Sequence, residues 1–265
     1  MTGPYRVAGK TVHVAPAFRM VGGMNQASAQ AYVQRIREAL GSKGYAAVAN
    51  DVGYVVVGKG TPDQLKRVTQ ALIDSPAFAK YSKGDPELGV RRMMWDHGIG
   101  MDCSGYVHHA LQAVHPRAKL GDPLASPLQS PPKAQFERIH PEATRPGDVV
   151  LLTTPGDAGH KVIVFARHEV PTGSELHGKI ARALNSGNQA EMHLLEVDSS
   201  WGAGGQPERG GVKREVWAYD ASSGRWASLV KGNSGQWHVT TSTTSGPYDH
   251  ELKGIYRFRG NVAVQ

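Results

Sequence analysis

The segment Asp102-Cys103-Ser104-Gly105-Tyr106 places the only cysteine of the 265-residue chain at the start of a predicted helix. The apolar residues that follow have the i, i+3, i+4, i+7 spacing of one buried helix face: Val107, Ala110, Leu111 and Val114. Cys103 would then lie in the first turn, where unpaired backbone amides and the helix dipole favour a thiolate. A lone cysteine usually just packs in a core. The position, more than the residue type, therefore predicts a nucleophile.

A second pair of signals lies further along the chain. Residues 146–148 (Pro-Gly-Asp) form a turn signal, and the apolar run 149–152 after it predicts a buried strand. A second apolar run, 159–165, predicts a strand with His160 at its mouth. An imidazole can take the proton of a thiol, hold the thiolate as an ion pair and later protonate a leaving amine. His160 is therefore the candidate base. The histidines near the cysteine helix are expected to be surface or structural residues: His97, His108, His109 and His115.

The DCSG string, the aromatic residue after it and the downstream histidine at a strand start resemble the catalytic core of the NlpC/P60 family of papain-like cysteine peptidases. The resemblance implies an α+β fold in which the cysteine helix packs on an antiparallel sheet and a histidine from that sheet activates the thiol. It covers roughly residues 81–260, and its specific motifs surround Cys103 and His160 only. It implies an amidase or endopeptidase that cuts peptidoglycan stem peptides, often at bonds involving D-glutamate and diaminopimelate, with no cofactor and no metal.

A third polar group normally orients the imidazole through its other ring nitrogen. In the family this group comes from the next strand, which the sequence predicts at residues 192–200. Aligning the end of this strand with the usual family pattern makes Glu196 the orienting residue. Asp198, two residues on and on the same face, is a near equal. Either carboxylate would favour a protonated imidazole more strongly than an amide would. The alternative is that one or both carboxylates bond the glycine-rich turn that follows.

Acyl transfer also needs donors for an oxyanion, and the backbone amide of Cys103 is the candidate. Ser104 is expected to cap the helix, and Asp102 to bond nearby amides. The tyrosine that the family places shortly before its cysteine has no counterpart at that position. Tyr81 lies farther back, while Trp95, close to the motif, is expected either to line the cleft or to pack in the core.

The chain is expected to comprise an N-terminal α+β extension, residues 1–80, and a catalytic domain, residues 81–265. Within the extension, apolar spacing predicts helices at 28–41 and 61–73, and the Val-rich stretch 46–57 indicates a strand. No Ser/Gly linker separates the two parts, which favours a structural elaboration of the core over a separate targeting or substrate-selecting domain.

The region after the cysteine helix is expected to be loop first and sheet later. The proline-rich stretch 121–132 predicts a loop that could rim the cleft. After residue 200 the chain alternates turns with short strands, including those at 212–219 and 254–258. The predicted sheet has about five or six strands.

The net charge of +7 and the isoelectric point near 9.5 favour an anionic partner. The chain has no finger, helix-turn-helix or RNA-binding signature, so no nucleic acid is expected. The bacterial wall, with its carboxylates and anionic polymers, fits the nucleophile motif better. No apolar stretch approaches the roughly twenty residues of a membrane helix, so no stable membrane insertion is expected.

The amino end also lacks the apolar core of a secretory signal. Enzymes that remodel a wall act outside the cytoplasm. The chain is therefore interpreted as an antibacterial effector, made in a bacterial cytoplasm where its compartment keeps it harmless, and secreted into the periplasm or wall of a rival cell. An immunity protein is a candidate partner. Three alternatives stay open. They are a papain-like acyltransferase or deamidase acting on a protein, a non-catalytic wall-binding module with Cys103 merely buried, and a nucleic-acid binder supported only by charge.

Overall fold

The computed structural model describes residues 3–18, 26–120, 135–153, 159–187, 189–201, 210–221, 224–231, 236–240 and 251–260. The chain divides into two compact units. The first comprises Met1–His109, Gly121–Ser126 and Ser199–Lys213, and the second comprises Ala110–Leu120, Pro127–Asp198 and Arg214–Gln265. The predicted loop at 121–132 lies outside the described residues. Each unit is described by itself.

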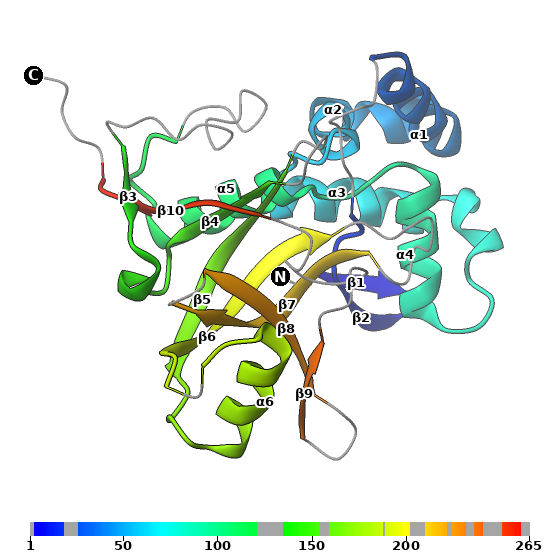
Figure 1. The fold of residues 1–265 in the computed structure, drawn as a ribbon. Coiled ribbons are helices and arrows are strands. Elements are labelled where there is room, and N and C mark those ends of the chain that lie inside the picture. The colour runs from blue at the N-terminus through cyan, green and yellow to red at the C-terminus, as the bar shows by residue number, and fades with distance from the viewer. Residues whose placement is uncertain are drawn as a thin grey trace, which may run out of the picture. The chain divides into compact units, whose positions relative to one another are not determined.

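The first unit is mainly helical (Figure 1). It begins with an antiparallel hairpin in which Tyr5 lies opposite Val12. Its elements, in chain order, are β1 Gly3–Val7, β2 Lys10–Val14, α1 Gln26–Ala46, α2 Ala49–Val56, α3 Pro62–Ile73, η1 Pro76–Lys80, α4 Pro86–Asp96 and the start of α5 Cys103–Val114. The backbone of Gly41 inside α1 is not helical, with φ 65°, so the helix is broken at the residue where the sequence predicts its end.

Helix α3 follows directly from its sequence. Thr61 is the N-cap, and its side chain accepts a hydrogen bond from the backbone of Gln64, whose own side chain bonds the Thr61 backbone amide. This reciprocal pair is a capping box, and Pro62 suits the first helical position because no intrahelical partner is needed there. The face with Leu65 and Val68 is buried. The predicted helix at 61–73 is confirmed.

The predicted strand at 46–57 is wrong, because most of this stretch forms helix α2. Its buried residues recur at helical spacing, with Val52, Val55 and Val56 fully inside. Arg67 of α3 donates two hydrogen bonds, of 2.7 and 3.0 Å, to the Asp51 carboxylate. A Val-rich composition favours strands, but packing against α1 and α3 overrides that preference here.

The second unit contains most of an eight-stranded sheet with the order β3-β10-β4-β5-β6-β7-β8-β9 (Figure 1). The strands are β3 Phe136–Ile139, β4 Val149–Thr153, β5 His160–Glu169, β6 Met192–Trp201, β7 Gly211–Asp220, β8 Arg225–Lys231, β9 Trp237–Thr240 and β10 Glu251–Phe258, with the short helix η3 Pro141–Ala143 after β3. The last strand, β10, returns to lie between β3 and β4. The predicted strands at 149–152, 159–165, 192–200, 212–219 and 254–258 are confirmed, and the predicted sheet was too small.

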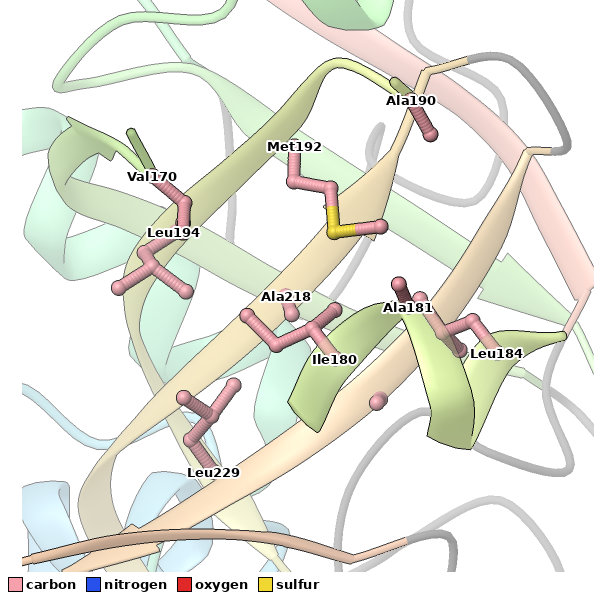
Figure 2. Close-up of a cluster of buried hydrophobic side chains, with 10 residues drawn as sticks. Val170, Ile180, Ala181, Leu184, Ala190, Met192, Leu194, Ala218 and Leu229 are labelled. Carbon is pink, nitrogen blue, oxygen red and sulfur yellow. The ribbon is translucent and has the colours of Figure 1, made fainter. Parts of the chain in front are cut away.

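Helix α6, Glu175–Leu184, covers part of this sheet and was not predicted. Ser174 caps its start by accepting a hydrogen bond from the His177 backbone, and Asn185 ends it in the left-handed conformation. Figure 2 shows Ile180 and Leu184 of the helix in the buried cluster with side chains of the sheet. The strand residues of that cluster are Met192, Leu194, Ala218, Ala227 and Leu229. Burial of this face supplies the hydrophobic free energy that holds the helix on the sheet.

The fold class is α+β with an antiparallel sheet, as predicted. The division into units differs from the predicted boundary at residue 80, because the start of α5 belongs to the same unit as the N-terminal helices. The backbone explains this. The Met101 amide donates to the Ala17 carbonyl at 2.9 Å, and the Asp102 amide donates to the Gly58 carbonyl at 3.0 Å. Within the described ranges, no helix is both long and apolar enough to cross a membrane.

Candidate active site

Cys103 is the first residue of α5, at the helix start that the sequence predicts, and it is half-buried. The residue two positions before Cys103, Met101, is held in place by burial and by hydrogen bonds of its backbone. Met101 is fully buried, forms an isolated parallel bridge with Phe18, and its carbonyl accepts a hydrogen bond of 2.6 Å from the Ser200 hydroxyl. We call residues 101–105 the cysteine turn. A buried residue before an accessible thiol gives the sulfur a fixed platform.

Asp102, not Ser104, caps the helix. One Asp102 carboxylate oxygen accepts a hydrogen bond of 2.6 Å from the Gly105 backbone amide, and the Asp102 carbonyl accepts from Tyr106 at 3.0 Å. This is the N-cap arrangement, in which a short polar side chain bonds the amide of the third helical residue. The Ser104 hydroxyl bonds the same carboxylate oxygen at 3.1 Å. The predicted capping role of Ser104 is therefore wrong, and the local-amide role of Asp102 is confirmed.

Gly105 is required by a close approach of two backbones. A Cβ atom at this position would lie 2.2 Å from the Gly58 carbonyl oxygen and 3.2 Å from an Asp102 carboxylate oxygen. The first distance is shorter than any real Cβ contact. The glycine of the DCSG string therefore lets the first turn of α5 lie directly against the segment after α2.

The predicted buried face of α5 is only partly right. Val107 and Leu111 are fully buried, and Tyr106 is nearly so. Ala110 is half-buried, whereas Val114 is 58% exposed. Helical spacing alone could not show that the last turn of the helix leaves the core.

Lys59 is the residue at this site that the sequence analysis missed. Its side chain is buried, and its ammonium lies 2.9 and 2.7 Å from the two carboxylate oxygens of Asp102. The backbone carbonyl of Lys59 also accepts a hydrogen bond of 2.9 Å when Nε2 of His109 carries its proton. The only signal in the sequence is a lysine between two glycines, Gly58 and Gly60, which does not predict burial.

His160 is the first residue of β5 and is 7% exposed, in the strand-start position that the sequence predicts. It lies opposite Leu152 of β4. The turn before β4 also matches the prediction, with Gly147 at φ 91°, a left-handed conformation that favours glycine. Asp148 after it is buried and bonds Arg257 of β10 through both carboxylate oxygens at 2.9 Å. Cys103 belongs to the first unit and His160 to the second.

Glu196 and Asp198 do not share a face with His160. Asp198 lies directly opposite Ile163, and cross-strand pairs project to the same side of a sheet. Ile163 is three residues after His160 without a bulge between them, so the two side chains project to opposite sides. Glu196 is two residues before Asp198 and shares its side.

Both carboxylates have cationic partners on that side. The Arg214 guanidinium donates to the two Asp198 oxygens at 2.7 and 2.9 Å. Glu196 lies 3.0 Å from Nε2 of His168 and 3.8 Å from Arg214. The strand register therefore does not favour either carboxylate as the residue that orients His160. The turn after β6, which the alternative assigned as their partner, lies outside the described residues. We leave both out of the proposed catalytic group.

The other aromatic and histidine residues near α5 have structural contacts. Burial lowers the pKa of His97, whose ring nitrogen Nδ1 lies 2.9 Å from the Met93 carbonyl. Tyr81 is buried, and its hydroxyl donates to Asp96 at 2.7 Å; burial and that hydrogen bond raise its pKa. The pKa of His109 is also lowered, chiefly by burial. His115 packs against Phe258, with ring centroids 5.0 Å apart. Trp95 lies half-buried in α4.

The cysteine turn can present a thiolate to an incoming carbonyl, and β5 offers an imidazole at a strand end. Among the described residues, no group of three or more His, Cys, Asp or Glu side chains could hold a metal ion. Comparison of the chain with protein-family models, with curated proteins and with solved structures finds no match.

Proposed function

We propose that the chain is a cysteine hydrolase of papain-like type that cleaves amide bonds in peptidoglycan stem peptides. The observation that carries the proposal is Cys103, which is half-buried rather than fully buried, at the start of a helix whose first turn is capped by Asp102 and bonded to the Gly58 carbonyl. A thiol that only packs in a core is normally buried. A thiol that keeps some solvent exposure beside first-turn amides is instead placed to ionise and to meet a substrate.

In the proposed reaction, the Cys103 thiolate attacks the amide carbonyl carbon and forms a carbon–sulfur bond. The carbonyl oxygen becomes an oxyanion, for which the Cys103 backbone amide is the proposed donor. Collapse of this intermediate breaks the carbon–nitrogen bond, and the His160 imidazolium gives its proton to the leaving amine. Water then attacks the thioester while His160 accepts its proton, which releases the acid and restores the thiolate.

The substrate class and setting come from the motif resemblance and from charge. The net charge of +7 suits a wall that carries carboxylates and anionic polymers. On this proposal the protein is an antibacterial effector that acts in the wall or periplasm of a target cell, with an immunity protein of the producer as a candidate partner. An enzyme of the same type acting on a protein amide would need the same two residues.

Digestion of purified sacculi, read by mass spectrometry of the released muropeptides, tests the proposal. The native protein should produce new amine termini, and the Cys103→Ala and His160→Gln variants should not. His168→Gln is the matched control, because His168 is an exposed histidine of the same strand whose side chain contacts Glu196. This control should keep full activity. Equal digestion by native protein and Cys103→Ala would refute the proposal.

The pairing of the two residues has its own measurement. Cys103 is the only thiol, so the pH dependence of its alkylation by iodoacetamide reports its ionisation directly. Loss of an imidazolium that stabilises the thiolate should move the inflection of this profile upward by one pH unit or more in His160→Gln, on the order of the shift that a nearby opposite charge produces. An unchanged profile would remove His160 from the mechanism. If sacculi stay intact while His160→Gln does shift the profile, the protein-directed acyltransferase or deamidase becomes the better reading.

A further inference from the structure

A buried ion pair lies at the cysteine turn and involves the residues on both sides of Cys103. The Lys59 ammonium bonds both carboxylate oxygens of Asp102, the residue before the cysteine, and also the hydroxyl of Ser104, the residue after it. The Lys59 and Asp102 side chains are each 9% exposed. A lysine is almost never this buried unless it is paired. Lys59 is therefore held at the cysteine turn by its charge.

The Asp102 carboxylate both caps the start of α5 and pairs with the Lys59 ammonium. One Asp102 oxygen accepts from the Gly105 amide at 2.6 Å and from the Lys59 ammonium at 2.9 Å. The backbone supports this arrangement, because the Gly58 carbonyl accepts from the Asp102 amide at 3.0 Å. The segment around Lys59 thus fixes the geometry of the helix start through one side chain and one carbonyl.

The Lys59 and Asp102 charges lie within the turn that carries the thiol, so they act on its ionisation through the local electric field. A buried carboxylate adjacent to a thiol disfavours the thiolate, because like charges repel strongly in a low-dielectric site. The Lys59 ammonium compensates that carboxylate at hydrogen-bond distance. His109, which also contacts the Lys59 backbone, has a pKa lowered mainly by burial and so contributes no charge at neutral pH. Lys59 and Asp102 are the charged groups that these contacts place at the turn.

We propose that Lys59 is a positioning residue for Cys103: it locks the cap of α5 through Asp102 and cancels the carboxylate charge that would otherwise suppress the thiolate. Its consequence for catalysis rests on the proposed hydrolase function. The effect of Lys59 on the ionisation of the Cys103 thiol does not rest on that function, and it can be measured without any substrate.

The test is the pH profile of Cys103 alkylation in a double-mutant cycle of Lys59→Met, Asp102→Asn and both together. Lys59→Met should raise the inflection by about one pH unit, since the carboxylate is left uncompensated. Asp102→Asn keeps a side chain suited to N-capping and leaves the ammonium uncompensated, so it should lower the inflection. The double variant should return close to the native value. Lys66→Met, which removes an exposed lysine of α3, is the matched control and should leave the profile unchanged.

The cycle remains decisive if Lys59→Met does not fold. Replacing both members of a buried pair by neutral residues is often tolerated, so Asp102→Asn and the double variant can be compared directly. A higher inflection in the double variant than in Asp102→Asn supports the proposal, and identical inflections in these two proteins and the native one overturn it. A native protein that leaves sacculi intact but shows the predicted cycle would refute the hydrolase and retain the role of Lys59.

Discussion

Gly105→Ala should disrupt the cysteine turn. The new Cβ would lie 2.2 Å from the Gly58 carbonyl oxygen and 3.3 Å from its carbon. Neither atom can move freely, because the same carbonyl accepts the Asp102 amide hydrogen bond. The helix start and the segment after α2 must therefore separate. That separation weakens two hydrogen bonds at once: the Asp102 side-chain cap on the Gly105 amide and the bond from the Asp102 amide to the Gly58 carbonyl.

The magnitude follows from two opposing terms. Alanine in a helix is favoured over glycine by about 1 kcal/mol. Overpacking a well-filled site costs about 1–3 kcal/mol, and weakening an N-cap costs about another 1 kcal/mol. The expected result is a net loss of about 2 kcal/mol in the free energy of unfolding, measured by urea denaturation, together with a changed rate of Cys103 alkylation.

Gly53→Ala provides the control within the same unit. Gly53 is an exposed residue of α2, and a Cβ there would meet nothing within 4 Å. This variant should gain up to about 1 kcal/mol, since only the helix preference changes. If Gly105→Ala proved as stable as Gly53→Ala and its thiol reacted at the native rate, the close approach inferred at Gly58 would be wrong.

Three further changes test the rest of the molecule. Asp148→Ala removes a buried carboxylate from Arg257 and should cost about 3 kcal/mol in urea denaturation, whereas a loss below about 1 kcal/mol would show that the pair is dispensable. Burial lowers the pKa of His97 and His193, so the unfolded chain binds more protons; stability should fall as pH drops below about 6.5, by up to about 1.4 kcal/mol per pH unit for each histidine until its folded pKa is passed. Flat stability from pH 7.5 to 5.5 would contradict this. Ile180→Ala should cost about 2–5 kcal/mol, because the side chain is fully buried between α6 and the sheet, and calorimetry that detects no loss would contradict that packing.

The sequence predicts well wherever a local signal fixes the backbone. The Thr61-Pro62 start of α3, the glycine turn before β4 and the helix start at Cys103 all appear where they were predicted. In each case the deciding contacts lie within a few residues, as in the Thr61 and Gln64 capping box. Patterns of this kind do not depend on what the rest of the chain does.

Predictions failed where the deciding contact is distant in sequence. The stretch 46–57 has the composition of a strand, but Arg67 and the neighbouring helices stabilise it as α2. Glu196 and Asp198 were assigned to His160 by alignment, yet the register with β5 and the partner Arg214 set their direction. Strand alternation identified the shared face of the two carboxylates correctly. It could not say which face that was relative to a neighbouring strand.

Lys59 is the strongest example, because its partner Asp102 is 43 residues away and no local pattern joins them. The two compact units do not divide at residue 80 for the same reason: Ala17 and Gly58, both before it, accept backbone hydrogen bonds from the cysteine turn. This dependence is testable. A chain starting at residue 81 loses those acceptors and the Lys59 ion pair, and leaves the Asp102 carboxylate without its cation. We expect this shorter chain to lack a stable start of α5, and its thiol to be alkylated with the pH profile of an unstructured cysteine, whose inflection is near 8.5. A profile identical to that of the full chain would show instead that residues 81–265 build the cysteine turn by themselves.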